Sequence, residues 1–325
     1  MYDKSKEDAN DLDDDETRRF LEALIDVHQT YGLYMPFVNS HARNIVSGGV
    51  DLISKRQAHN GSGFLPWHRV YVLHLERLLQ ASDPSVALHY WKFDEPAPNI
   101  FDDGFMGSKN TTSSEWVNFD LANPLASWQI PGESVGIRRE TSFNETTNNP
   151  SGINEIATLA LGATFSAFRT MESNPHGNAH LSGSSTSWYR TSQTAVQDPL
   201  FFLLHSNIER LWAKWQFTNN RYDPNDVDSY DLQGSFASPP AGLAPVYAAS
   251  GSSISQNRTL GHYLEDTIWP WNDVTGGVGL EERPATAPLT PLPTAIGSIF
   301  GGKPSVGSTI EFRYCLLYTS DAADD

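Results

Sequence analysis

Histidines are the residues of this chain whose spacing points most directly to chemistry. Ten are present, and six of them fall into two groups. The first group is His41, His59 and His68, and the second is His176, His180 and His205. The four-residue step from His176 to His180 would place both rings on one face of a helix, where they could hold a single ion. Imidazole nitrogen suits copper, zinc, iron or nickel, so the two groups predict metal binding.

The cysteine content and the net charge narrow the choice of function. The chain has one cysteine, Cys315, which excludes a disulfide within the chain and a thiolate-based zinc or iron–sulfur site. Any metal ligands must therefore be nitrogen or oxygen atoms. A net charge of −17 argues against nucleic acid or an anionic membrane as partner. No apolar run in the sequence approaches the length needed to cross a bilayer.

Helical patterning surrounds the histidines, so the sequence predicts a mainly α fold. Helices are expected over about residues 34–45, from Pro66 to about residue 80, and over about residues 153–170. Asp198 and Pro199 are typical of a helix start, which places His205 one to two turns inside a further helix. Metal sites in helical bundles use side chains from facing helices. We therefore expect a helical bundle that holds a metal centre.

The remaining sequence predicts how the bundle is bounded. Stretches rich in Pro, Gly, Asn, Ser and Thr, mainly residues 94–150 and 231–310, predict long loops with a few short strands around the helices. Residues 1–16 are expected to form a solvated acidic leader. Residues 17–314 would then form one catalytic domain, and residues 315–325 a non-native or disordered tail.

Three segments that carry these histidines resemble the copper-binding motifs of the tyrosinase and catechol oxidase family, the type-3 copper proteins. They are a pair of histidines nine residues apart that ends in FLPWHR, the segment ESNPHGNAH, and the segment DPLFFLLHSNIERLW, in the order that the family has. The resemblance implies two copper ions, with O2 as co-substrate. It assigns His41, His59 and His68 to the first copper, and His176, His180 and His205 to the second. His28 competes with His41 as the first ligand, but the run of residues 34–41 favours His41.

The same resemblance implies roles for residues beside the ligands. Glu172 is expected near the incoming phenol, where a carboxylate could accept the phenolic proton. Phe201 is expected to stack on the ligand ring four residues further along the helix. Asn207 and Glu209 are expected to position rings and backbone by hydrogen bonding. Gly177 stands where many members that hydroxylate monophenols carry an asparagine.

These residues imply an enzyme that oxidises o-diphenols to o-quinones, with weak or no hydroxylation of monophenols. Gln57 stands where many fungal relatives carry a cysteine linked to the middle ligand of the first copper, so no thioether is expected. Gly177 and Leu181 leave one side of the pocket mouth uncharged, which favours small neutral phenols. A tyrosinase with full monophenolase activity, a hemocyanin-like O2 carrier and an inactive, copper-free protein stay open as alternatives.

The sequence contains less information about the cellular compartment and the oligomeric state of the protein. Four Asn-x-Ser/Thr sequons favour a secreted protein whose signal peptide is absent or lost by truncation; they are at Asn60, Asn110, Asn144 and Asn257. The oligomeric state stays open. Four further histidines are expected in the core rather than on a metal, and these are His28, His74, His89 and His262.

Overall fold

The structure is a computed structural model and describes residues 6–43, 58–110, 112, 116–139, 152–181, 186–223, 226–230, 268 and 270–271. Its α-helices are α1 (Asp14–Ile25), α2 (Met35–Arg43), α3 (Phe64–Ser82), α4 (Glu155–Leu159), α5 (Phe165–Phe168), α6 (Asn178–Leu181) and α7 (Leu200–Asn219). Short 3-10 turns are η2 (Pro124–Ser127), η3 (Arg169–Glu172), η5 (Trp188–Arg190) and η6 (Ala195–Gln197), and π-helical turns are η1 (Asp26–Thr30) and η4 (Ser173–Gly177). A two-stranded antiparallel sheet pairs β1 (Ser108–Lys109) with β2 (Val117–Asn118). The prediction of a mainly α fold with few strands is confirmed.

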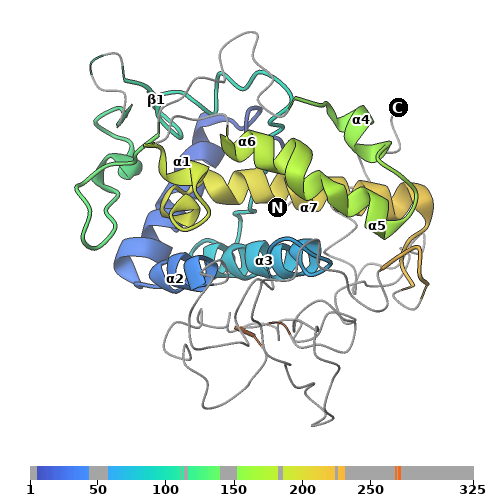
Figure 1. Ribbon diagram of the computed structural model, residues 1–325. Coiled ribbons are helices and arrows are strands. Elements are labelled where there is room, and N and C mark those ends of the chain that lie inside the picture. The colour runs from blue at the N-terminus through green and yellow to red at the C-terminus, as the bar shows by residue number, and fades with distance from the viewer. Residues whose placement is uncertain are drawn as a thin grey trace.

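The long helices α3 and α7 pack together at the centre of the fold (Figure 1). Both are buried over most of their length, because each is apolar around nearly its whole circumference. Aromatic contacts join them: the rings of Tyr71 and Phe202 stack with centroids 5.2 Å apart. A later segment also reaches this core, since the indole Nε1 of Trp271 donates a hydrogen bond of 2.9 Å to Nδ1 of His74.

A buried ion pair fixes α3 against α7. Nε of Arg69 lies 2.7 Å from both carboxylate oxygens of Glu209, and Nη2 donates to Oε1 of Gln216 at 2.9 Å. The guanidinium carbon also lies 3.5 Å from the ring centroid of Trp212. Because Arg69 directly follows His68 in the chain, this ion pair also holds in place the part of α3 that carries a predicted metal ligand.

The predicted helices are present, with differences at their ends. Helices α2 and α3 occupy the expected segments, and α7 begins at Leu200. Asp198 does accept a hydrogen bond from the Leu200 N–H at 3.0 Å. Its two carboxylate oxygens also bind the fully buried guanidinium of Arg139, each at 2.7 Å. The carboxylate that was expected as a helix cap therefore also neutralises a charge in the core.

The helix predicted over residues 153–170 is not continuous in the structure. The sequence favours a single helical stretch over residues 153–170, whereas the structure has the separate helices α4 and α5. Gly162 lies between them with φ of +154°, and a Cβ there would lie 2.5 Å from Cβ of Ala167. Glycine suits such a close approach because it has no side chain.

The N-terminal segment differs from the expected solvated leader. The ammonium of Lys6 is buried against Glu76 at 3.0 Å, and the Ala9 N–H donates to the Tyr90 carbonyl at 2.7 Å. Helix α1 begins inside the acidic run, where Asp13 and Glu16 form a capping box. The division into leader, domain and tail stays a prediction, because residues 1–5 and 315–325 lie outside the described residues, as do Gln57 and His262.

Candidate metal centre

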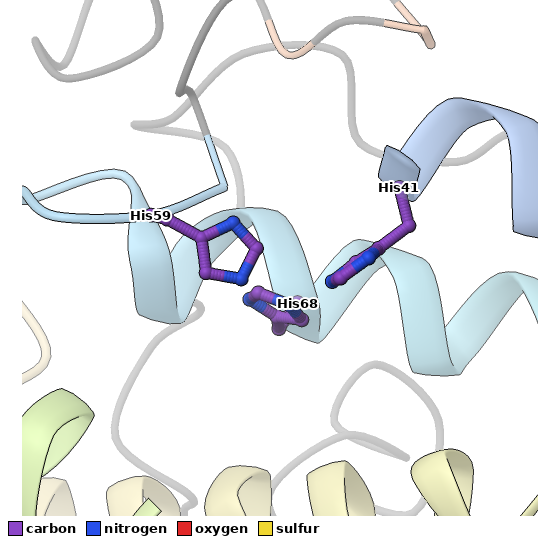
Figure 2. Close-up of side chains that lie close together, drawn as sticks. All are labelled: His41, His59 and His68. Carbon is purple, nitrogen blue, oxygen red and sulfur yellow. The ribbon is translucent and has the colours of Figure 1, made fainter. Parts of the chain in front are cut away.

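Three imidazoles from separate elements converge to form the first histidine group. Figure 2 shows His41 at the end of α2, His59 on the loop before α3, and His68 on α3, with their rings turned toward one another. One ring nitrogen from each lies within 4.8 Å of the other two. His41 and His68 are buried, and His59 is half-buried. This spacing suits a single ion held by three nitrogens.

The second histidine group is built from the turn η4 and helices α6 and α7. Nε2 of His205 lies 3.3 Å from Nε2 of His176 and 3.3 Å from Nε2 of His180. The two groups adjoin, because the rings of His68 and His205 stack with centroids 4.1 Å apart. The facing helices α3 and α7 therefore bring two three-nitrogen sites into one centre.

Hydrogen bonds at Nδ1 orient most of these rings. Each of the four bonds runs to a backbone carbonyl: His41 to Ser192 at 2.9 Å, His68 to Phe64 at 3.0 Å, His176 to Glu172 at 2.7 Å, and His180 to Tyr189 at 2.6 Å. A carbonyl only accepts, so Nδ1 carries the proton and Nε2 carries a free lone pair. The bonds therefore aim unprotonated nitrogens at the centre.

The surroundings keep the imidazoles neutral. Burial, followed by the neighbouring imidazoles, lowers the pKa of His41 to about 3, and burial lowers that of His180 to about 4. The pKa values of the other four are well below the usual 6.5, again chiefly through burial; these are His59, His68, His176 and His205. Nε2 of His41 and Nε2 of His68 are buried with no hydrogen-bond partner among the described residues. Neutral, unpartnered nitrogens fit a metal ion that takes their lone pairs.

Two phenylalanines pack directly on the imidazoles. The expected stacking of Phe201 is present, since its ring lies 4.1 Å from that of His205 with an interplanar angle of 26°. The second is Phe64, whose ring centroid lies 4.9 Å from that of His68 and 4.8 Å from that of His176. It therefore touches one ligand of each group. Its only sequence signal is its place at the head of the FLPWHR motif.

Glu172 lies between segments of both groups. Its carboxylate accepts a hydrogen bond of 2.5 Å from the backbone N–H of Asn60, the residue after His59, while its carbonyl accepts from His176. Burial raises the pKa of this carboxyl to about 7. A Cβ added to Gly177 would lie 3.4 Å from the Glu172 carbonyl oxygen, so a side chain fits there.

The structure agrees with some of the remaining predicted roles and not with others. Asn207 is buried and its Oδ1 accepts from Arg210 at 3.0 Å, so its described contact is with a guanidinium and not with an imidazole. His28 binds the Gln129 carbonyl at 2.9 Å and packs on Trp128, apart from both histidine groups. The structure thus favours His41 over His28. Buried His74 and His89 are core residues, as expected.

Comparison of the sequence with known proteins identifies the family to which these histidine groups belong. The family model for the common central domain of tyrosinase matches residues 24–218. The chain belongs to the tyrosinase family. It is 28% identical to a tyrosinase of Streptomyces antibioticus in an alignment of 282 residues that covers 80% of this chain and 90% of that relative. It is 26% identical to a latent chloroplastic polyphenol oxidase of Prunus armeniaca in an alignment of 237 residues that covers 66% of this chain and 39% of the relative.

A solved structure supports the same fold. A mutant polyphenol oxidase from Thermothelomyces thermophila matches with a TM-score of 0.51 at 17% identity, covering 69% of this chain and 73% of that chain. The tyrosinase family uses two copper ions with O2 as co-substrate, and the two histidine groups provide six nitrogens for such a pair. This member of the family is therefore a copper oxidase of phenolic compounds. Among the described helices, none combines the length and apolar character needed to span a membrane.

Proposed function

We propose that this protein oxidises o-diphenols to o-quinones and hydroxylates monophenols weakly or not at all. In this proposal His41, His59 and His68 hold one copper ion, and His176, His180 and His205 hold the other. The convergence of these six imidazoles within adjoining groups is the observation that carries the proposal. A copper pair held there would supply the redox chemistry, since copper can carry electrons from diphenols to O2, with two diphenols oxidised for each O2 reduced to water.

The protein residues orient the substrate and handle its protons. Glu172 has a carboxyl whose pKa is raised to about 7 by burial, so it exchanges protons near neutral pH. Such a group can accept the proton of a phenolic hydroxyl or orient a water that does so. Phe64 and Phe201 cover ligand rings with apolar surface, which excludes water from them.

The preference for diphenols rests on Gly177. A monophenol has a single hydroxyl, and its reaction depends on removal of that proton. An amide side chain next to His176 would help Glu172 to hold a water for this purpose, and glycine supplies none. The uncharged Gly177 and the exposed Leu181 also favour small neutral phenols over substrates that carry a carboxylate.

Oxygen uptake measured beside copper analysis tests the proposal. We expect two copper ions per chain, rapid O2 uptake with catechol and 4-methylcatechol, and slow uptake with tyrosine and guaiacol. Comparable turnover of tyrosine and catechol would refute the diphenol preference. Reversible O2 binding without oxidation of catechol would instead identify a carrier.

A pair of histidine variants separates ligands from core residues. His176→Ala should abolish catechol oxidation and remove one copper ion, because a two-ligand site binds copper poorly. His28→Gln is the matched control, since His28 lies outside both groups and Gln can still donate to the Gln129 carbonyl. It should retain two copper ions.

We also propose that the protein is secreted. The asparagines of two sequons, Asn60 and Asn110, are among the described residues, and the side-chain oxygen of Asn110 accepts from the N–H and the hydroxyl of Thr112, both at 2.8 Å. The test is the mass of the protein from its natural source before and after removal of N-linked glycans. An unchanged mass would argue against this proposal.

A further inference from the structure

One short segment contacts a ligand from each histidine group. We call residues 188–194 the bridging segment. The carbonyl of Tyr189 accepts from Nδ1 of His180 at 2.6 Å, and the carbonyl of Ser192 accepts from Nδ1 of His41 at 2.9 Å. His180 belongs to the second group and His41 to the first. Two carbonyls three residues apart therefore orient one imidazole at each metal site.

Other ligands are oriented differently. His68 and His176 donate to the carbonyl four residues earlier in their own segments, Phe64 at 3.0 Å and Glu172 at 2.7 Å. Those rings therefore keep their orientation as long as the local turn of the chain persists. His41, by contrast, lies 151 residues before the carbonyl that orients it. Its ring depends on where the bridging segment lies.

Side-chain hydrogen bonds hold the bridging segment in place. Oγ1 of Thr194 donates to the Trp188 carbonyl at 2.7 Å and lies 2.5 Å from Oγ1 of Thr191, which closes the segment on itself. Nη1 of Arg190 donates to the Leu181 carbonyl at 2.6 Å, at the end of α6. The segment is thus tied to the helix that carries His180.

We infer that the bridging segment couples the two metal sites, and that Thr194 is the positioning residue that holds its carbonyls. The inference rests on the proposed assignment of the six histidines as copper ligands. An ion bound to one histidine group fixes the ring of His41 or His180, and hence the bridging segment. The segment then holds the corresponding ring of the other group. The second ion then meets a ring that is already held and pays less to order it, so the two ions bind cooperatively, whichever binds first.

A substitution pair at Thr194 tests this inference. Thr194→Val removes the hydroxyl and keeps the side-chain shape, while Thr194→Ser keeps the hydroxyl and is the matched control. The measurement is titration of each copper-free protein with Cu(I) in competition with a chromogenic chelator. We expect the unaltered protein and Thr194→Ser to take up two ions in one cooperative step. Thr194→Val should bind both ions about 10–100-fold more weakly and without cooperativity.

Several outcomes would overturn the inference. A Thr194→Val isotherm like that of the unaltered protein would show that the hydroxyl does not position the segment. Weakening of one ion, with the other unchanged, would show that the segment serves a single site. Should Thr194→Val fail to fold, Arg190→Met removes the bond to Leu181 instead, and an unchanged isotherm there would be equally decisive. Uptake of fewer than two ions by the unaltered protein would instead overturn the ligand assignment in the proposed function.

Discussion

Replacement of Glu209 by glutamine should destabilise the protein far more than its conservative chemistry suggests. Glu209 and Arg69 form an ion pair between α7 and α3, with side chains only 6% and 3% exposed. Glu209→Gln keeps the shape of the side chain and removes its charge, so the buried guanidinium loses the carboxylate that lies 2.7 Å from its Nε. Breaking one partner of such a pair costs about 3–5 kcal/mol. We expect that loss in the free energy of unfolding of the copper-free protein.

Removal of both charges should cost less than removal of one. Burial raises the pKa of Glu209 even though Arg69 lowers it, so desolvation of the carboxylate outweighs its attraction to the guanidinium. A pair of this kind adds little net stability. The double variant Arg69→Met/Glu209→Leu would still leave Oε1 of Gln216 without the donor that Arg69 supplies. An orphaned buried acceptor costs about 1–3 kcal/mol, which sets the expected cost of the double variant.

Urea unfolding monitored by tryptophan fluorescence provides the assay, and Trp212, 3.5 Å from the guanidinium carbon, lies at the perturbed contact. Glu209→Asp is the matched control, because it keeps the charge and removes one methylene group. The single variants Arg69→Met and Glu209→Leu, each costing about 3–5 kcal/mol, with their double variant costing about 1–3 kcal/mol, would show the coupling of the pair. The reasoning fails if Glu209→Gln costs less than about 1 kcal/mol, or if the double variant costs the sum of the two singles.

Three further predictions concern the centre itself. Gly177→Asn should raise the ratio of tyrosine to catechol turnover by about 10–100-fold, since the amide can help Glu172 to hold a water, and Gly177→Ala, which adds only the Cβ, should not. Phe201→Ala should lower the free energy of unfolding by about 3–5 kcal/mol by opening a cavity beside His205. Phe201→Leu should cost less, and equal urea midpoints for the two variants would contradict this account. The copper-free protein should lose stability as the pH falls below about 6.5, because the six imidazoles have lowered pKa values and the unfolded chain binds protons that the folded protein excludes. Each imidazole should lower the free energy of unfolding by about 1 kcal/mol between pH 7.5 and pH 5.5, so the urea midpoint should be much lower at pH 5.5.

The sequence contains enough information for the central helices and for the six histidines. Helices α2, α3 and α7 follow local rules of apolar spacing and helix starts, and these rules act within a few residues. Five of the six histidines lie in three motifs of several residues each, and the order of these motifs along the chain is that of the family. The stacking of Phe201 on His205 follows from a four-residue step on a helix, which is also a local rule.

The contacts that hold the site together could not be predicted in this way. Arg69 and Glu209 lie 140 residues apart, and nothing local to either residue names its partner. The contact of Glu172 with Asn60 spans 112 residues. The carbonyls of Tyr189 and Ser192 carry no signal at all, because every residue has a carbonyl and only the fold decides where it points.

Spacing along α7 connects the metal centre to the stability of the core. Phe201, His205 and Glu209 follow at four-residue steps and so lie along one stripe of that helix. The stripe meets α3, where His68 stacks on His205 and Arg69 binds Glu209. A shift between α3 and α7 would therefore break the ion pair and separate the two histidine groups together. The contacts that hold the helices in register are thus the ones that bring the two metal sites into a single centre.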